Sequence, residues 1–522
     1  MKYSIGCQTF STIIEKGMVY VDKTDLIYDL AQRHVCFCSR PRRFGKSLML
    51  STLKSYFLGK KELFRGLKIE QLENDWIVYP VLHLDFANGG LSNEGGLLQK
   101  LHYALSSWEK EYGLTMVSEN PGIRFEHVIR EIRHRTGQKV VVLVDEYDKP
   151  LLDVLGELLE QQNREILKSF YGTFKTVDEH LQFVMLTGVT KFSQVSVFSG
   201  FNQPEDISQN SRFDALCGIT EEELHQVFDE EMEAFAAKRG MGKEDAFLLF
   251  KRKYDGYHFS EDLLDVYNPF SVLNALSQRK ADDYWFATGT PTYLMKLIDS
   301  NHVNIQQLLS IPYERGFFMD YRADVEKPLP MLYQSGYLTI KDVDDTDFDT
   351  SYWLGFPNAE VEKGLVTLLA NNYFQHESEE STNLVKSMAQ MLRECRLNDL
   401  RDTLTAFLGS IPYGSNQQEK AKDYESHYHY TLYLIFRLLS CYIVLTEKQN
   451  SRGRADIIVE TENHVFIFEF KLDASAQNAL DQIEHQGYAE PYLTDKRQIV
   501  KIGVAFSSEK KNIVEWKTIS NE

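Results

Sequence analysis

The sequence lacks closely spaced cysteine pairs of the CxxC type. Its six cysteines are scattered over 522 residues, without a CxxC pair or a metal-type cluster. Secreted disulfide frameworks and cysteine-based zinc sites depend on such spacing, so both are excluded. We therefore expect buried thiols in a protein of a reducing compartment.

Long hydrophobic runs are also absent. The most apolar stretch, Leu432–Leu445, has 14 residues and contains Arg437, whereas a helix that crosses a bilayer needs about 20 apolar residues. The N-terminal segment has neither the apolar core nor the small-residue cleavage site of a signal peptide. We expect a cytoplasmic protein that does not contact a membrane.

An excess of positive charge is missing as well. The chain has 57 Lys and Arg against 76 Asp and Glu, a net charge of −19, which argues against a surface that coats nucleic acid non-specifically. Any contact with DNA or RNA must be local. Hydrophobic residues make up 43% and charged residues 25%, as in folded globular proteins, and the length predicts two to four domains.

The chain divides into three parts. Residues 1–215 alternate short β-branched or aromatic runs with longer helical stretches, which is typical of βαβ units and a parallel sheet. Residues 216–414 predict a mainly helical middle region, and residues 415–522 predict a smaller α/β domain. The expected strands of the first part are Val35–Cys38, Pro80–Phe86, Val140–Val144 and Phe183–Thr187.

The last part has the order helix, two strands, helix, strand, with mixed strand pairing. Its expected elements are a helix at Asp423–Leu445, strands at Ala455–Glu460 and Val465–Leu472, a helix at Ser475–Gln486 and a strand at Val500–Phe506.

A candidate phosphate-binding loop follows the first strand. The strand leads to Gly45-Lys46-Ser47 and then to a helix-forming segment. In such loops, backbone N–H groups and the helix N-terminus face the phosphates, the lysine reaches the β and γ oxygens, and the hydroxyl binds Mg²⁺. The general pattern has glycine where this chain has Arg40, which resists a left-handed backbone by ~1–2 kcal/mol. We therefore expect the first turn of this loop to differ.

An acidic pair ends a strand further along the chain. Asp145 and Glu146 follow the buried run Val140–Val144, where an NTPase needs one carboxylate near the metal and one to orient the attacking water. A solvated acidic turn would give the same pattern. The next strand ends near Thr187 and Thr190, and either threonine is a candidate polar sensor at the sheet edge.

Several segments of residues 1–215 resemble the AAA-ATPase-like family of bacterial and archaeal proteins. They are Tyr20–Thr24, RPRRFGKSLMLSTL, YPVLHLDF, VVLVDEYDKPLL, LTGVTKFS and VFSGFNQPEDIS, in this order. The family's own loop is similar to RPRRFGKS, so Arg40 departs from the general pattern and not from the family.

The resemblance implies ATP and Mg²⁺ as cofactors. It gives Ser47 and Asp145 metal roles and Glu146 the attacking water. Arg42 and Arg43 are candidates for contacts with phosphates or a partner, although surface arginines often make neither. The residues assigned to the nucleotide are Arg42, Arg43, Phe44, Gly45, Lys46, Ser47 and Asp145.

A second cluster of charged residues lies in the last part. Asp456 opens one expected strand, while Glu469 and Lys471 are two residues apart on the next and share one face. Two carboxylates on neighbouring strands can hold a divalent metal, with the lysine activating water at a phosphodiester. A charged pair on the solvent side of an amphipathic strand would show the same spacing.

This arrangement resembles the PD-(D/E)XK nuclease superfamily over about residues 415–516. The resemblance implies that Asp456 and Glu469 bind a metal and that Lys471 is catalytic. It matches Glu425 to the upstream acid that some members use as a further metal ligand, and Gln482 to a polar residue that contacts DNA.

We therefore expect an ATPase that acts on nucleic acid, with DNA favoured over RNA. In this hypothesis ATP binding or hydrolysis gates metal-dependent cleavage. The alternative is a nucleotide-driven switch whose C-terminal domain binds nucleic acid or protein without cutting; a non-enzymatic scaffold is disfavoured by two intact sets of catalytic-type residues. Arg212 follows the last strand of the ATPase region and is a candidate arginine finger for a homo-oligomer.

Overall fold

The computed structural model of the chain forms two compact units. One comprises Met1–Asn301 with Leu308–Glu362, and the other comprises His302–Gln307 with Lys363–Glu522. The division into domains 1–215, 216–414 and 415–522 stays a prediction. The structure describes residues 1–191, 204–288, 294, 304–319, 328–345, 349–374, 378–410, 431, 433–439, 444–446, 449–450, 453–454 and 456–520.

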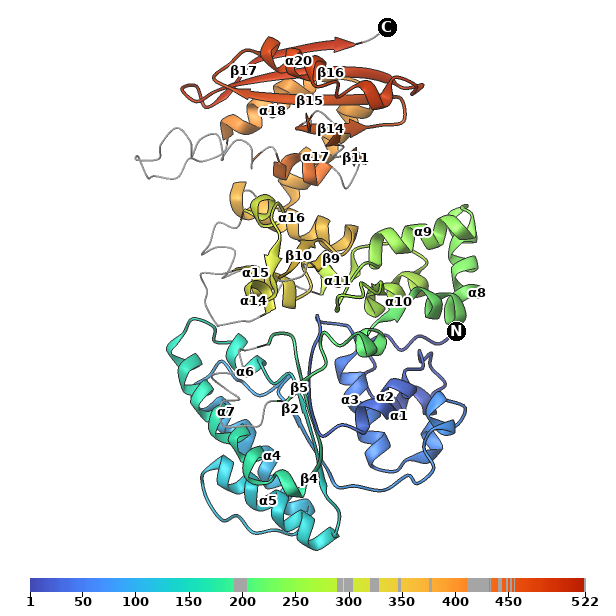
Figure 1. Ribbon diagram of the computed structural model, residues 1–522, viewed down its shortest axis with the longest axis vertical. Helices are drawn as coiled ribbons and strands as arrows, with labels where there is room; N and C mark the ends of the chain where they lie inside the picture. The colour runs from blue at the N-terminus through green and yellow to red at the C-terminus, as the bar shows by residue number, and fades with distance from the viewer. Residues whose placement is uncertain are drawn as a thin grey trace. The chain divides into compact units, whose positions relative to one another are not determined.

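A five-stranded parallel sheet lies at the centre of the N-terminal region (Figure 1). Its strand order is β2-β3-β4-β1-β5, and every pair is parallel. The sheet confirms the predicted βαβ organisation. Its strands are β1 (Val35–Ser39), β2 (Val81–Asp85), β3 (Val140–Asp145), β4 (Leu181–Gly188) and β5 (Glu205–Asp206).

Helices cover both sides of this sheet (Figure 1). The strand β3 is buried along its whole length, as its run of β-branched residues predicts for a parallel strand. Helix α5 begins after the capping residue Asn120 with Pro121 at its first position and ends at Gly137, which are the usual start and stop signals. The helices are α1 (Phe10–Glu15), α2 (Thr24–Ala31), α3 (Lys46–Phe57), α4 (Gly96–Glu111), α5 (Pro121–Thr136), α6 (Lys149–Leu152) and α7 (Leu158–Thr176).

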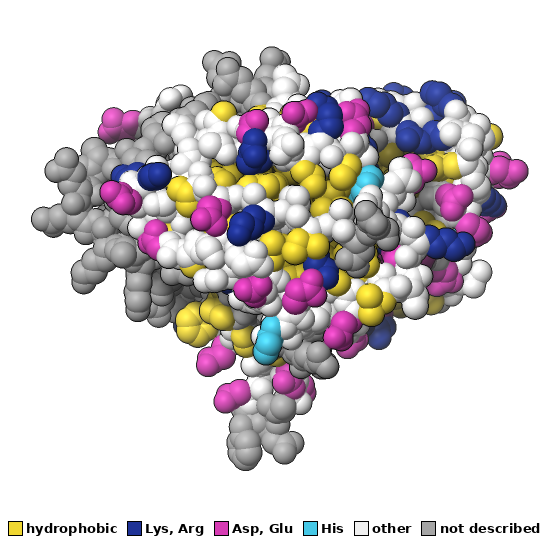
Figure 2. Space-filling model, turned by 90° about the horizontal axis from the view of Figure 1, so that it is seen from above, with side chains coloured by type: hydrophobic (Ala, Val, Ile, Leu, Met, Phe, Trp, Pro, Cys, Tyr) yellow, Lys and Arg dark blue, Asp and Glu magenta, His cyan; other side chains and the backbone are white. Residues whose placement is uncertain are grey.

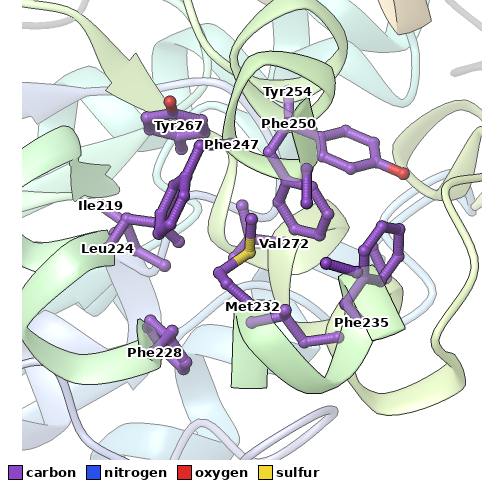
Figure 3. Packing of buried hydrophobic residues seen from close by; sticks show 14 residues of the cluster. Ile219, Leu224, Phe228, Met232, Phe235, Phe247, Phe250, Tyr254, Tyr267 and Val272 are labelled. Carbon is purple, nitrogen blue, oxygen red and sulfur yellow. The ribbon is translucent and has the colours of Figure 1, made fainter. Parts of the chain in front are cut away.

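A helical region follows in the same unit. The helices α8 (Glu221–Arg239), α9 (Lys243–Tyr254) and α10 (Pro269–Gln278) pack around buried side chains that include Phe228, Met232 and Phe250 (Figure 3). The short strands β6 (Ile219–Thr220) and β7 (Val266–Tyr267) pair at one edge of this cluster. The predicted helical middle region is confirmed.

The middle region also contains strands that its helical composition did not predict. The strand β10 (Thr350–Gly355) pairs antiparallel with β8 (Tyr313–Glu314) on one side and with β9 (Thr339–Asp345) on the other. The acidic residues at the far end of β9 are exposed, so its hydrophobic pattern is weak. The helices in this stretch of the chain are α11 (Tyr284–Ala287), α13 (Ile305–Leu308), α14 (Arg315–Met319), α15 (Pro328–Gln334) and α16 (Ala359–Phe374), and most of α13 and α16 belongs to the second unit.

The second unit contains a mixed five-stranded sheet of order β11-β14-β15-β16-β17. Strands β15 and β16 are parallel and the other pairs are antiparallel, which confirms the predicted mixed pairing. The elements are α17 (Ser378–Arg393), α18 (Leu397–Ser410), β11 (Val444–Thr446), β14 (Ile457–Glu460), β15 (His464–Leu472), α20 (Ala476–His485), β16 (Gln498–Ser507) and β17 (Asn512–Ser520), with the short pair β12 (Gln449–Asn450) and β13 (Gly453–Arg454).

One expected element of this unit ends differently. The chain is helical at 433–439, but Val444–Thr446 forms the edge strand β11, so the prediction of a helix continuing to Leu445 is wrong. The β-branched and apolar residues there pair with β14 instead. Strand β17 was not predicted, because most of its side chains are exposed and it lacks an apolar face.

Candidate functional sites

The phosphate loop joins β1 to α3. Arg43 and Gly45 adopt left-handed conformations, with φ of 66° and 94°, whereas Arg40 does not. Gly45 is the residue before the first turn of α3, where a positive φ favours glycine. The expectation that the first turn of this loop departs from the glycine form is therefore confirmed.

Arg40 anchors the loop from within the protein. Its side chain is buried, and its guanidinium donates to the carbonyl oxygens of Ser208 at 2.6 Å and Phe213 at 3.2 Å. The guanidinium also lies over the ring of Phe259, 4.0 Å from the ring centre, in a cation–π contact. The residue that replaces the usual glycine thus fixes the start of the loop to the segment after β5.

Lys46 closes the loop on itself. Its ammonium donates to the carbonyl oxygens of Arg40 at 2.9 Å and Pro41 at 3.0 Å, and the side chain is buried. Ser47 follows it in the first turn of α3 and is half-buried. The ammonium is therefore held at the loop by two backbone carbonyl oxygens.

The acidic pair lies at the carboxyl end of β3. The Asp145 side chain is only 4% exposed, and its Oδ1 accepts from Thr187 Oγ1 at 2.7 Å and from the Glu146 backbone N–H at 3.0 Å. Glu146 adopts a left-handed conformation with φ of 52°. Burial raises the pKa of Glu146, Asp145 raises it further, and the Lys46 ammonium opposes both effects. Electrostatics thus couple the two halves of the candidate nucleotide site.

The two candidate threonines have different surroundings. Thr187 contacts Asp145, whereas Thr190 donates its hydroxyl to Asp148 at 2.8 Å and its backbone N–H at 2.6 Å. Asp148 is buried, and burial raises its pKa. Thr187 is the one that faces the acidic end of β3, while Thr190 and Asp148 hold the turn after β4.

Two further carboxylates near this edge were not singled out from the sequence. Asp85 ends β2 in parallel register with Asp145, and its Oδ1 accepts from the backbone N–H of Ala87 at 2.7 Å. Asp148, three residues after Asp145, is the other. The signal for Asp85 was present, since an aspartate ends the apolar run at Pro80–Phe86.

The candidate arginines differ in their contacts. Arg42 and Arg43 are exposed, and the Arg43 guanidinium lies 5.1 Å from the centre of the Phe270 ring. The proposed finger Arg212 donates from Nε to Asp29 at 2.6 Å. Phe44, by contrast, is a buried core residue whose ring packs edge-on against Tyr257.

The second candidate site lies on β15. Glu469 is only 1% exposed, and its Oε1 accepts from the Lys471 ammonium at 2.9 Å. Its Oε2 is buried without a hydrogen-bond partner in the described part of the chain. Burial raises the pKa of Glu469, and so does Asp456. Asp456 precedes β14 and accepts from the backbone N–H of Phe470 at 2.8 Å.

The helix α20 explains why Glu469 is buried. Glu469 is in register with Gly503 on β16, and a side chain at Gly503 would meet the backbone of Ala476 at 2.2 Å. The face that carries Glu469 is therefore the face that α20 covers. The reading of Glu469 and Lys471 as a solvated pair on an exposed strand face is wrong for Glu469.

The residues present fit a divalent cation in part. Within the described ranges, no three His, Cys, Asp or Glu side chains cluster closely enough to hold a metal ion. Mg²⁺ is often held by one or two carboxylates with water completing its shell, and the Glu469 oxygen that lacks a hydrogen-bond partner among the described residues is an acceptor of the right kind. Glu425 lies outside the described residues. Gln482 is half-buried on α20.

These features define a class of protein that joins a P-loop NTPase-type sheet to a nuclease-like mixed sheet. Residues 4–198 match the family model described as Predicted AAA-ATPase, and residues 423–516 match the PD-(D/E)XK nuclease superfamily. The chain is 35% identical to "Uncharacterized protein in vnfD 5'region" of Azotobacter chroococcum mcd 1, over 98% of both chains. It belongs to the family of AAA-ATPase-like proteins with a C-terminal PD-(D/E)XK nuclease superfamily domain.

Among the residues that the structure describes, no helix has both the length and the apolar character needed to cross a bilayer.

Proposed function

We propose that this protein hydrolyses ATP at the β1–α3 loop and cleaves nucleic acid phosphodiester bonds at the β14–β15 site, with nucleotide controlling cleavage. The observation that carries the proposal is the buried carboxylate of Glu469, one oxygen of which has no hydrogen-bond partner among the described residues. Burying an ionised group without full pairing is costly, and the ion pair with Lys471 engages only one of the two oxygens of Glu469. A carboxylate at this position is explained if it binds a cation.

At the first site, each residue has a role that its position supports. Lys46 exchanges its carbonyl partners for the β and γ phosphate oxygens, and Ser47 and Asp145 hold Mg²⁺. Mg²⁺ supplies charge neutralisation for the phosphates. The raised pKa of Glu146 suits a residue that accepts a hydrogen bond from water and takes up its proton.

At the second site, Asp456 and Glu469 hold the divalent metal and Lys471 orients the attacking water or stabilises the developing charge. The 2.9 Å contact between the Lys471 ammonium and Glu469 keeps the lysine beside the carboxylates. Glu425 remains a proposed further ligand and Gln482 a proposed contact to nucleic acid, with DNA favoured over RNA. Cations in this site come from the solvent, so the activity depends on added Mg²⁺ or Mn²⁺.

The charge of the molecule limits how nucleic acid binds. The chain carries a net charge of −19, and on the face drawn in Figure 2 acidic and basic side chains are interspersed. Binding through such a surface relies on a few local contacts with phosphates. The affinity should therefore depend on salt concentration only weakly, because that dependence scales with the number of phosphate contacts.

A nucleotide-driven switch without cleavage is the second candidate. In that case the C-terminal domain binds nucleic acid or protein and does not cut it.

Two assays separate these functions. Purified full-length protein is incubated with linear, circular and single-stranded DNA and with RNA, in Mg²⁺ or Mn²⁺, while ATP turnover is measured in parallel. Lys46→Ala is expected to abolish turnover, with the exposed Lys61→Ala as a matched control. Glu469→Gln is expected to abolish cleavage, with Glu462→Gln in the exposed turn before β15 as its control. Turnover without any metal-dependent cleavage would favour the switch.

A further inference from the structure

The tip of the phosphate loop is held by a residue far away in the sequence. Trp285 on α11 donates a 3.0 Å hydrogen bond from its indole Nε1 to the backbone carbonyl oxygen of Arg42. The next residue, Arg43, has its guanidinium over the ring of Phe270, at the start of α10. Two successive loop residues are thus fixed from the helical middle region.

This hydrogen bond determines how one peptide group of the loop is oriented. Because a trans peptide is planar, the N–H of Arg43 points in the opposite direction to the carbonyl of Arg42, and so away from Trp285. Backbone N–H groups of such a loop are the ligands of the phosphates. The hydrogen bond from Trp285 to the Arg42 carbonyl oxygen therefore directs the Arg43 N–H to the opposite side of the loop.

Arg43 needs such support because its backbone is strained. Its φ is 66°, and a non-glycine residue pays ~1–2 kcal/mol for a left-handed conformation. Strained residues persist only where neighbouring contacts over-determine them. The indole hydrogen bond one residue before and the Phe270 contact at its side chain are the contacts that do so here.

Trp285 is itself fixed by a buried carboxylate. Its backbone N–H donates to Glu360 Oε1 at 2.5 Å, and Ser271 donates its hydroxyl to Glu360 Oε2 at 2.8 Å. Glu360 is only 1% exposed and Trp285 5%. The Trp285 ring also packs against Tyr337 with ring centres 5.1 Å apart. The indole therefore has little freedom to turn away from the loop.

We propose that Trp285 is a positioning residue of the nucleotide site, and that Glu360 acts through it. The inference rests on the proposed binding of ATP at this loop. It assigns to the middle region a direct part in forming the phosphate site, so that the loop of residues 40–46 is complete only when α10 and α11 are in place.

The test compares nucleotide binding by full-length variants, using mant-ATP with Mg²⁺. Trp285→Phe keeps an aromatic ring and removes the donor, and it should weaken binding about tenfold, the equivalent of one hydrogen bond of about 1.4 kcal/mol. Trp353→Phe on β10 is the matched control and should bind as the wild type does. In turnover, KM for ATP should rise while kcat stays within about twofold, because the loop binds ground state and transition state alike.

A second pair of variants tests Glu360. Glu360→Gln retains an oxygen for the Trp285 N–H and should bind like the wild type, whereas Glu360→Met has similar length without an acceptor and should resemble Trp285→Phe. Phe270→Leu should also weaken nucleotide binding. It replaces Trp285→Phe as the test variant if Trp285→Phe lowers the melting temperature by more than a few degrees.

The outcomes distinguish a failure of the positioning role from a failure of the proposed ATPase function. Wild-type affinity in both Trp285→Phe and Phe270→Leu would overturn the positioning role while leaving the ATPase proposal intact. Equal loss in Glu360→Gln and Glu360→Met would overturn the part assigned to Glu360. If the wild type itself binds no nucleotide, and Lys46→Ala behaves identically, the proposed function fails and the inference fails with it.

Discussion

Thr187 on β4 donates a 2.7 Å hydrogen bond from Oγ1 to Oδ1 of Asp145 on β3. Both side chains are buried. Because β4 lies between β3 and β1 in the sheet, this bond joins the acidic strand end to the strand that borders the phosphate loop. The Thr187 hydroxyl thus sets which oxygen of Asp145 remains for a metal or water.

Removing this hydroxyl should slow ATP hydrolysis more than it weakens ATP binding. Thr187→Val preserves the shape of the side chain, and we expect kcat to fall about tenfold or more while the Kd for mant-ATP changes little. Thr187→Ser keeps the hydroxyl and should retain most of the activity. Steady-state ATP turnover measures both, and an equal loss in the serine and valine variants would contradict the role.

Restoring the general glycine at position 40 should harm the protein. Arg40→Gly removes the guanidinium that is bonded to the carbonyls of Ser208 and Phe213, and these buried acceptors lose their donors. The free energy of unfolding should fall by about 3 kcal/mol, as measured by urea unfolding. Arg65→Gly, at an exposed arginine, is the control. Unchanged stability in Arg40→Gly would show that the loop does not depend on this anchor.

The buried carboxyl group of Asp255 should make its own contribution to a decline of stability as pH rises. Burial, with a smaller effect of Asp265, raises the pKa of Asp255 from 3.8 to about 7. Between these values the unfolded chain has lost the proton that the folded chain keeps, so this group lowers stability by up to about 1.4 kcal/mol per pH unit. Above pH 7 its effect is constant.

The variant Asp255→Asn removes this dependence. Relative to the wild type, it should gain stability between pH 4.5 and pH 7, measured by urea unfolding at several pH values. Asp75→Asn, at an exposed site, should follow the wild-type profile. Parallel profiles for Asp255→Asn and the wild type would mean that Asp255 is ionised in the folded protein throughout.

Glu469→Gln should separate stability from activity. The raised pKa of Glu469 means that its charged form is disfavoured in the fold, so a neutral amide should leave stability at pH 8 unchanged or higher by about 1 kcal/mol. Mn²⁺ should raise the melting temperature of the wild type and not that of the variant. A variant that unfolds more easily yet keeps the Mn²⁺ effect would show that Glu469 is a structural residue.

Much of both sites could be predicted from local sequence. Lys46 and Asp145 each follow or end a short apolar strand, and parallel strands bring their carboxyl ends to one edge of a sheet. The two-residue spacing of Glu469 and Lys471 likewise placed them on one face of a strand. Each of these patterns lies within a short segment, so a single sequence is enough to detect it.

Other features depend on contacts between distant segments. The bond from Trp285 to Arg42 joins residues separated by 243 positions, and no local pattern points to it. Whether the face of Glu469 was covered depended on how closely α20 approaches Gly503. The strands β9 and β17 carry many exposed polar side chains, so their hydrophobic periodicity was too weak to detect.

The most direct test of nucleotide-controlled cleavage is the effect of ATP on the cleavage rate of the intact protein. Cleavage of a single DNA substrate is followed in Mn²⁺, with and without ATP, for the wild type, Lys46→Ala and Glu469→Gln. ATP should change the wild-type rate, Lys46→Ala should cleave at a rate independent of ATP, and Glu469→Gln should not cleave. Cleavage by Glu469→Gln at the wild-type rate, or an identical ATP effect in Lys46→Ala, would contradict the proposed function.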